Sequence, residues 1–198
     1  TGSGGGIFVN SNTQLDLDNV KVIRSKASND GGGICASVSS TVTISNSQFS
    51  GNEANSDGGA IYSDGILDIN NSTLSFNEAN FGGGLHLYYP SGPSPNTTIV
   101  NSTICNNSAN NGGGIYIYSG VPVSIDFSTI SNNSTSGSGG GILNFYGNPT
   151  IKNTLIGNNT ASTGNDFHSA GGTITDNGYN IVENSSGFSW SATGDITG

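Results

Sequence analysis

The chain has 198 residues and a mass of 20.0 kDa, which suits one domain or a short repeat array. Its net charge is −9 with only four Lys and Arg residues, and this excludes a basic surface for nucleic acid or anionic membranes. Charged residues make up only 9%, which excludes the usual, highly charged type of disordered chain. Abundant Gly, Asn, Ser and Thr instead indicate many turns and short strands.

A motif of Gly-Gly, then Gly or Ala, then Ile or Leu recurs every 24 to 30 residues. Its copies begin at Gly4, Gly31, Gly58, Gly82, Gly112 and Gly139, with a degenerate copy near Gly164. A fixed period of this length without a helical pattern is typical of a β-solenoid with one coil per repeat. We therefore predict an all-β parallel β-helix of about seven coils, forming one domain over residues 1–198 with an irregular terminal coil over 165–198.

Three short segments follow one another within each repeat. The first comes directly after the glycines, as in IYIY at residues 115–118; the second is exemplified by VTIS at 42–45 and the third by STLS at 72–75. Their period-two alternation predicts three strands and three corners per coil.

Three columns of apolar residues align from coil to coil in these strands. They are Ile7, Ile34, Ile61, Leu85, Ile115 and Ile142; Leu17, Ile44, Ile69, Ile99, Ile125 and Ile151; and Val22, Phe49, Leu74, Ile104, Ile130 and Ile156. We expect these columns to point inward and to form a continuous three-sided core.

Asparagines form two further columns beside the third strand. One contains Asn52, Asn77, Asn107, Asn133 and Asn159, and the other contains Asn46, Asn71, Asn101 and Asn153. A side-chain amide can bond to the amide of the next coil and satisfy groups that would otherwise be buried without partners. We expect a structural asparagine ladder at the corners.

A hydrophobic-x-x-Asn motif precedes the glycine motif, as in Phe49-Ser50-Gly51-Asn52 followed by Gly58-Gly59-Ala60-Ile61. This pairing resembles the repeats of chlamydial polymorphic outer-membrane proteins, which are autotransporter passenger-like, and of related bacterial right-handed parallel β-helix proteins. The resemblance covers residues 4 to about 164. It implies right-handed coiling, a cell-surface or secreted location and an adhesive or structural role. Handedness rests on the resemblance, since periodicity alone does not set it.

The sequence shows no catalytic constellation. Enzymes that cleave polysaccharides on this scaffold need clustered acids, with a base or Ca²⁺ ligands. Here Asp30 and Asp57 align beside the glycine corner, Glu53 and Glu78 align in a turn, and we interpret both pairs as solvated charges. We predict a protein without catalytic residues, metal or cofactor; cleavage of a polysaccharide is the third hypothesis, together with carbohydrate binding.

The outward positions of the first strand form a row rich in aromatic residues. The predicted contact face contains Phe8, Tyr62, His86, Tyr88, Tyr116 and Tyr118. Exposed flat rings suit sugar stacking or protein contact, and cross-coil stacking that only stabilises the sheet is the alternative.

The outward positions of the third strand suggest a different use. Thr73, Ser75, Thr103, Thr129 and Ser131 form a ladder of the kind seen on some ice-binding proteins. Lys21 and Ile23 at one end, and Leu155 and Gly157 at the other, interrupt this array. Thr and Ser also simply suit outward strand positions. For both reasons ice binding is the alternative function and not the leading hypothesis.

The first residues already lie inside a coil, so we expect either a piece of a longer solenoid or an open end that pairs with another molecule. The leading hypothesis is a non-enzymatic, extracellular or cell-surface module that is adhesive or fibre-forming. Its partners would be further copies of itself, assembled end to end or laterally, or a surface glycan. No transmembrane segment or signal segment is evident, and Cys35 and Cys105 are expected to be free thiols.

Overall fold

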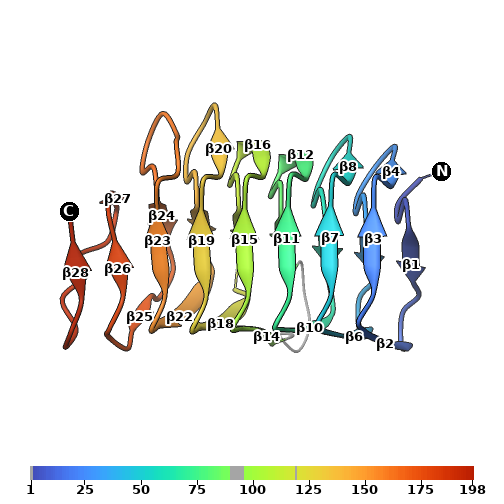
Figure 1. The fold of residues 1–198 in the computed structure, drawn as a ribbon, viewed down its shortest axis with the longest axis horizontal. Helices are drawn as coiled ribbons and strands as arrows, with labels where there is room; N and C mark the ends of the chain where they lie inside the picture. Colours follow the sequence, from blue (N-terminus) through green and yellow to red (C-terminus); the bar gives the residue numbers. More distant parts are fainter. Residues whose placement is uncertain (1, 90–95, 119) are drawn as a thin grey trace.

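A computed structural model describes residues 2–89, 96–118 and 120–198. All the strands of this part of the chain are parallel to their neighbours, and each pairs with the equivalent strand of the next coil. The coils therefore stack side by side along a rod, with the two termini at opposite ends (Figure 1). The predicted all-β parallel solenoid is confirmed.

Sheets A and B form two sides of the rod. Sheet A contains β1 (Ile7–Val9), β5 (Ile34–Ala36), β9 (Ile61–Ser63), β13 (Leu85–Leu87), β17 (Ile115–Tyr118), β21 (Ile142–Phe145), β24 (Phe167–Gly171) and β27 (Ser185–Ser186). Sheet B contains β2 (Gln14–Asp18), β6 (Thr41–Ser45), β10 (Ile66–Asn70), β14 (Thr97–Val100), β18 (Pro122–Asp126), β22 (Asn148–Lys152) and β25 (Thr175–Asp176).

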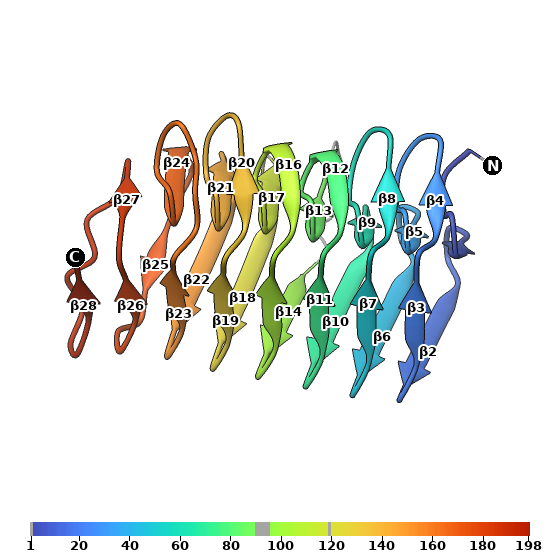
Figure 2. The same ribbon diagram turned by 45° about the horizontal axis from the view of Figure 1, so that its top comes forward.

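Sheets C and D complete the circuit. Sheet C contains β3 (Lys21–Ile23), β7 (Gln48–Ser50), β11 (Thr73–Ser75), β15 (Thr103–Cys105), β19 (Thr129–Ser131), β23 (Leu155–Gly157), β26 (Ile181–Val182) and β28 (Ile196–Thr197). Sheet D contains β4 (Lys26–Ala27), β8 (Glu53–Ala54), β12 (Glu78–Phe81), β16 (Ser108–Asn111) and β20 (Ser134–Thr135). Figure 2 shows sheet C in front of sheet B, with sheet D above them.

Sheet D corrects the expectation of three strands per coil. Among the described residues, the first five coils have four strands each, two later coils have three, and β27 and β28 form a partial last turn. The strands of sheet D are two to four residues long and rich in Asn, Ser and Ala, so the sequence resembles a turn there. They pair because the neighbouring coils hold their backbones at strand spacing.

The three predicted apolar columns form the core. Ile34 pairs with Ile61 in sheet A, and Ile44 with Ile69 in sheet B, in the expected register. Phe49 and Leu74 are adjacent in sheet C, and both are fully buried. Inward residues of each coil therefore contact the equivalent residues of the next coil, and the core is continuous along the rod.

The asparagine ladder runs inside the corner between sheets C and D. The side-chain amides of Asn52, Asn77, Asn107 and Asn133 each donate to Oδ1 of the asparagine in the next coil, at 2.9 to 3.0 Å. The same oxygens also accept the backbone N–H groups of the preceding coil. All four are essentially buried, so the ladder satisfies polar groups that water cannot reach.

The corner between sheets B and C holds a second ladder that the sequence analysis did not identify. Its members share a short hydroxyl side chain that accepts a backbone N–H from the preceding coil and donates to a carbonyl two residues earlier. They are Ser47, Ser72, Ser102, Ser128 and Thr154. The repeated Asn-Ser before the third strand is the signal that could have revealed it. The asparagines of that pair, such as Asn71 and Asn101, have φ near +47°, which Asn tolerates better than most residues.

Candidate functional site

An aromatic cluster covers the outer face of sheet A. Tyr62, His86 and Tyr116 are neighbours in register on β9, β13 and β17. The ring of His86 lies edge-on to both tyrosine rings, with centroids 5.4 Å from Tyr62 and 4.8 Å from Tyr116. Phe81, at the end of β12, lies over this row with its ring centroid 5.3 Å from that of Tyr116.

The row is less exposed than its outward register suggests. Phe8 is 51% exposed, but His86 and Tyr116 are only 4% and 6% exposed. The reason is that the chain folds back over sheet A before each glycine corner, which brings Phe81 and Asp57 onto the row. Gly58 allows this fold at φ +66°, where a Cβ atom would lie 2.4 Å from the Ile61 carbonyl oxygen.

Two acidic residues contact the cluster. The carboxylate of Asp57 lies 3.3 Å from Nδ1 of His86 without the alignment of a hydrogen bond. The hydroxyl of Tyr62 donates to Asp64 at 3.0 Å. Burial, reinforced by the nearby Asp64 charge, raises the pKa of Tyr62 above its ordinary value, and burial likewise raises the pKa of Asp64. These polar groups therefore interact within the cluster rather than with an open site.

A second outward column of sheet A is the accessible part of the cluster. Tyr88, Tyr118 and Phe145 follow one another on successive coils, with centroid distances of 5.0 and 5.6 Å. Their planes are inclined by only 38° and 20° to one another. All three are partly exposed, and Tyr146 stands edge-on beside Phe145. We call Tyr88, Tyr118 and Phe145 the aromatic strip.

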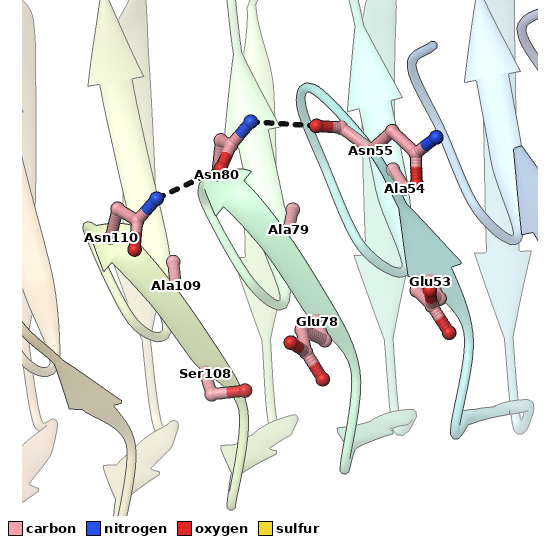
Figure 3. A pocket seen from close by; sticks show the side chains of 9 residues that line it. All are labelled: Glu53, Ala54, Asn55, Glu78, Ala79, Asn80, Ser108, Ala109 and Asn110. Carbon is pink, nitrogen blue, oxygen red and sulfur yellow. Dashed lines mark hydrogen bonds between the residues drawn. The ribbon is translucent and has the colours of Figure 1, made fainter. Parts of the chain in front are cut away.

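A polar trough of about 340 Å³ crosses three coils of sheet D (Figure 3). Its two sides are formed by Glu53, Glu78 and Ser108, and by Asn55, Asn80 and Asn110. Asn110 donates to the side-chain oxygen of Asn80, and Asn80 to the backbone carbonyl of Asn55. Lys26 forms an ion pair with Glu53, which partly offsets the repulsion between the adjacent glutamates.

The members of each acidic pair align in the sequence, but the two pairs have different surroundings in the structure. Glu53 and Glu78 are neighbours in sheet D, whereas Asp57 faces His86 and Asp30 accepts a hydrogen bond from Ser3. Within the described residues, no three His, Cys, Asp or Glu side chains gather in a way that could hold a metal ion. That part of the chain also has no helix long and apolar enough to span a membrane.

The residues of the predicted ice-binding face lie on sheet C. Thr73, Thr103 and Thr129 are adjacent and in register on β11, β15 and β19. Ser131 is partly exposed, but Ser75 is only 4% exposed and donates to Ser50, so it is not part of an open face. The column continues with Gln48 on one side and Leu155 on the other.

Sequence reasoning missed Phe81 and Tyr146, because neither belongs to a repeated strand position. Phe81 sits where the other repeats have Asn111 or Asp57, and Tyr146 follows the end of β21. In the structure Phe81 lies against His86 and Tyr116 of the buried row, and Tyr146 lies against Phe145 of the strip.

A family model described as a right-handed beta helix region matches residues 1–130. No curated protein and no solved structure matched the chain significantly. The matched region covers β1 to β18 and the first two residues of β19. The strands β20 to β26 extend the same four sheets in the same parallel arrangement. With its stacked coils and inward apolar columns, the chain belongs to the right-handed β-helix family.

Proposed function

We propose that this β-helix is a non-enzymatic, extracellular adhesive module that binds a carbohydrate polymer through the aromatic strip. One observation carries the proposal: Tyr88, Tyr118 and Phe145 form a row of partly exposed rings that contact one another at nearly the spacing of the coils. Because the rings pack against one another, a polymer that lies along the row contacts their exposed outer edges, with successive sugar units on successive rings.

The rings of the strip are held in place before any ligand binds. Tyr118 lies between Tyr88 and Phe145, and Tyr116 packs against Tyr118 from the neighbouring column at a centroid distance of 6.2 Å. Binding to a preorganised row loses little side-chain entropy, so the apolar area that the rings bury contributes more fully to affinity.

Two further observations support an adhesive rather than a catalytic role. The titratable groups nearest the strip are turned toward one another: His86 is buried against Asp57, and Tyr62 donates to Asp64. In addition, the paired GG(A/G)(I/L) and hydrophobic-x-x-Asn motifs resemble those of polymorphic outer-membrane proteins, which supports a surface location.

The proposal is tested by binding to insoluble polysaccharides and to a glycan array. We expect the unaltered chain to be retained, and Tyr118→Ala to weaken binding by about tenfold or more, as for a central aromatic contact. Phe127→Ala is the matched control, because Phe127 is 62% exposed and lies at the corner between sheets B and C, away from the strip. Equal retention of both variants, or no retained glycan, would reject the proposal.

We do not extend the proposal to ice binding, since in the described strands of sheet C only three threonines are in register, and Gln48 and Leu155 flank them. End-to-end assembly is a separate prediction. It would pair the edge strands β3 and β28 of sheet C in successive molecules. Long rods in negative-stain electron micrographs would support it, whereas short rods of a single length would contradict it.

A further inference from the structure

The last turn of the rod contains two carboxyl groups that bind the same buried asparagine. Asn180 is fully buried directly before β26, and its side-chain oxygen accepts the backbone N–H of Thr154 at 3.1 Å. Its side-chain amide donates to Oδ1 of Asp176 at 3.0 Å, and its backbone N–H donates to Oδ1 of Asp195 at 2.8 Å. Asn180 therefore continues the ladder at the corner between sheets B and C, and Asp176 and Asp195, here called the carboxyl pair, end it.

Asp176 is surrounded by N–H donors at the end of the inward column of sheet B. One oxygen accepts the backbone N–H of Gly178 at 3.0 Å, in addition to the amide of Asn180. The other oxygen accepts the backbone N–H groups of Ser191 and Ala192, both at 3.1 Å. These bonds favour the ionised form of Asp176, and they attach residues 191–192 to β25.

Asp195 has a different environment. Its Oδ2 is shielded from solvent and accepts no hydrogen bond from the described residues, and its carboxyl group contacts that of Asp176. The surrounding N–H groups already donate to Asp176 or to the other oxygen of Asp195. Two ionised carboxylates in contact repel each other. A proton on Oδ2 of Asp195 removes that repulsion and allows this oxygen to donate to Asp176.

We propose that the carboxyl pair is a proton-dependent latch: with one proton between Asp176 and Asp195 the last turn is closed, and loss of that proton releases residues 191–198. Few other bonds hold this segment. Strand β28 is the outermost strand of sheet C, at the C-terminal end of the rod (Figure 1). The amide of Ile196 donates to the Asn180 carbonyl at 2.8 Å, and that of Gly198 to the Val182 carbonyl at 3.2 Å.

The latch therefore controls whether sheet C ends in an ordered strand. It also controls the groove of about 440 Å³ that Ile196 lines together with Leu155 and Ile181. The inference does not depend on the aromatic strip, which lies on sheet A.

The two pKa values give the direction of the switch. Burial raises the pKa of Asp195, as does the adjacent Asp176, although the hydrogen bond from Asn180 lowers it in part. Burial also acts to raise the pKa of Asp176, but its hydrogen bonds outweigh this effect and hold the pKa below its ordinary value.

The latch is therefore closed within a window of acidic pH. The contribution of Asp195 to stability is complete below the unfolded-state pKa of about 3.9 and is lost as the pH rises through the folded-state pKa. The contribution of Asp176 is present above about pH 3.9 and is lost as the pH falls through its own folded-state pKa. We expect the last turn to be most stable near pH 4, as an approximate value, and to loosen on either side.

Other charged groups near the last turn face elsewhere. Lys152 is exposed on the outer face of β22, and Tyr179 is exposed. Asp166 and Glu183 accept backbone N–H groups at the other corner, between sheets C and D. Within the described part of the chain, no basic side chain forms an ion pair with the carboxyl pair.

Hydrogen exchange followed by NMR tests the latch. The amides of Ile196 and Gly198 report on the last turn, and the amide of Thr129, which donates to the Ser102 carbonyl in the middle of sheet C, reports on the rod. From about pH 4 to about pH 7, we expect the protection factors of Ile196 and Gly198 to fall several-fold. That of Thr129 should change much less.

Two variants separate the latch from other effects of pH. Asp195→Asn keeps an acceptor for Asn180 and carries an amide that donates to Asp176 at every pH, so Ile196 should stay protected at neutral pH. Glu183→Gln is the matched control, because Glu183 is exposed in the same turn but bonds at the other corner. It should keep the pH dependence of the unaltered chain.

Several results would overturn the proposal. They are protection of Ile196 that is constant or increases with pH, a pH dependence that persists in Asp195→Asn, and equal effects of Asp195→Asn and Glu183→Gln. Protection of Ile196 that Ca²⁺ restores at neutral pH would assign the carboxyl pair to a cation and would likewise reject the proton latch.

Discussion

The carboxylate of Asp166 ends the asparagine ladder by accepting two hydrogen bonds from Asn159, from its backbone N–H at 3.0 Å and its side-chain amide at 2.8 Å. Its second oxygen accepts the backbone N–H of Asn184 at 2.7 Å. A carboxylate has acceptors only, so it suits the last position of a ladder in which every asparagine donates in the same direction.

We predict that the contribution of Asp166 to stability decreases as the pH rises. Burial raises the pKa of this carboxyl, although its hydrogen bonds from Asn159 and Asn184 lower it in part. The unfolded-state pKa is about 3.9. The folded-state pKa lies above that value, so the contribution is complete below about pH 3.9 and is lost as the pH rises through the folded-state pKa.

Chemical denaturation of the unaltered chain and of Asp166→Asn between acidic and neutral pH measures this contribution. The free energy of unfolding of the unaltered chain, relative to the variant, should be largest in acid and smaller at neutral pH. A difference that grows with pH would contradict the assignment.

Replacing a central member of the ladder should be costly. Asn107→Ala removes the acceptor of the Asn77 side chain and backbone, and the donor to the Leu74 carbonyl, all of them buried. Leaving buried polar groups unpaired should lower the free energy of unfolding by about 2 to 4 kcal/mol. Asn110→Ala, on the exposed side of the same coil, should change it by less than about 0.5 kcal/mol. Similar losses in urea denaturation of the two variants would be the contrary result.

The second glycine of the motif should tolerate no side chain. A Cβ atom at Gly83 would lie 2.4 Å from the Ser108 carbonyl oxygen and 2.6 Å from that of Gly113, both in the next coil. Gly83→Ala should therefore force neighbouring coils apart and lower the melting temperature more than Gly51→Ala does. Gly51 has φ +66° and its nearest side-chain atom is 3.5 Å away, so its substitution costs about 1 to 2 kcal/mol of backbone strain alone. An equal or smaller fall in melting temperature for Gly83→Ala would contradict the close contact with the next coil.

The two thiols should differ in reactivity. Cys35 is 5% exposed, and its burial, together with the nearby Asp30 charge, raises its pKa to about 12. Cys105 is partly exposed on sheet C. A thiol reagent such as DTNB at about pH 8, near the ordinary thiol pKa, should therefore modify one thiol per folded chain, and none in Cys105→Ser. Rapid modification of both thiols in the native chain would contradict the burial of Cys35.

Local patterns in the sequence were sufficient to predict the solenoid and the residues of its core. Ile34, Ile61 and Leu85 stand in one column because period-two alternation decides which face a residue takes, and the glycine motif decides where each coil begins. The same spacing placed Asn77 and Asn107 one coil apart, at the distance where their amides bond. Sheet D was not predicted, because strands such as Glu53–Ala54 are too short to show alternation.

The sequence by itself therefore determined the parallel coils, their inward columns and the corners, since each depends on residues that repeat at fixed spacing. Only the tertiary structure decided which outward residues are accessible. His86 and Tyr116 occupy the outward column yet are buried, because Phe81 folds over them from another strand. Tyr118 and Phe145 stay partly exposed beyond that cover. Exposure depends on what the rest of the chain places above a residue, and no periodicity within one strand contains that information.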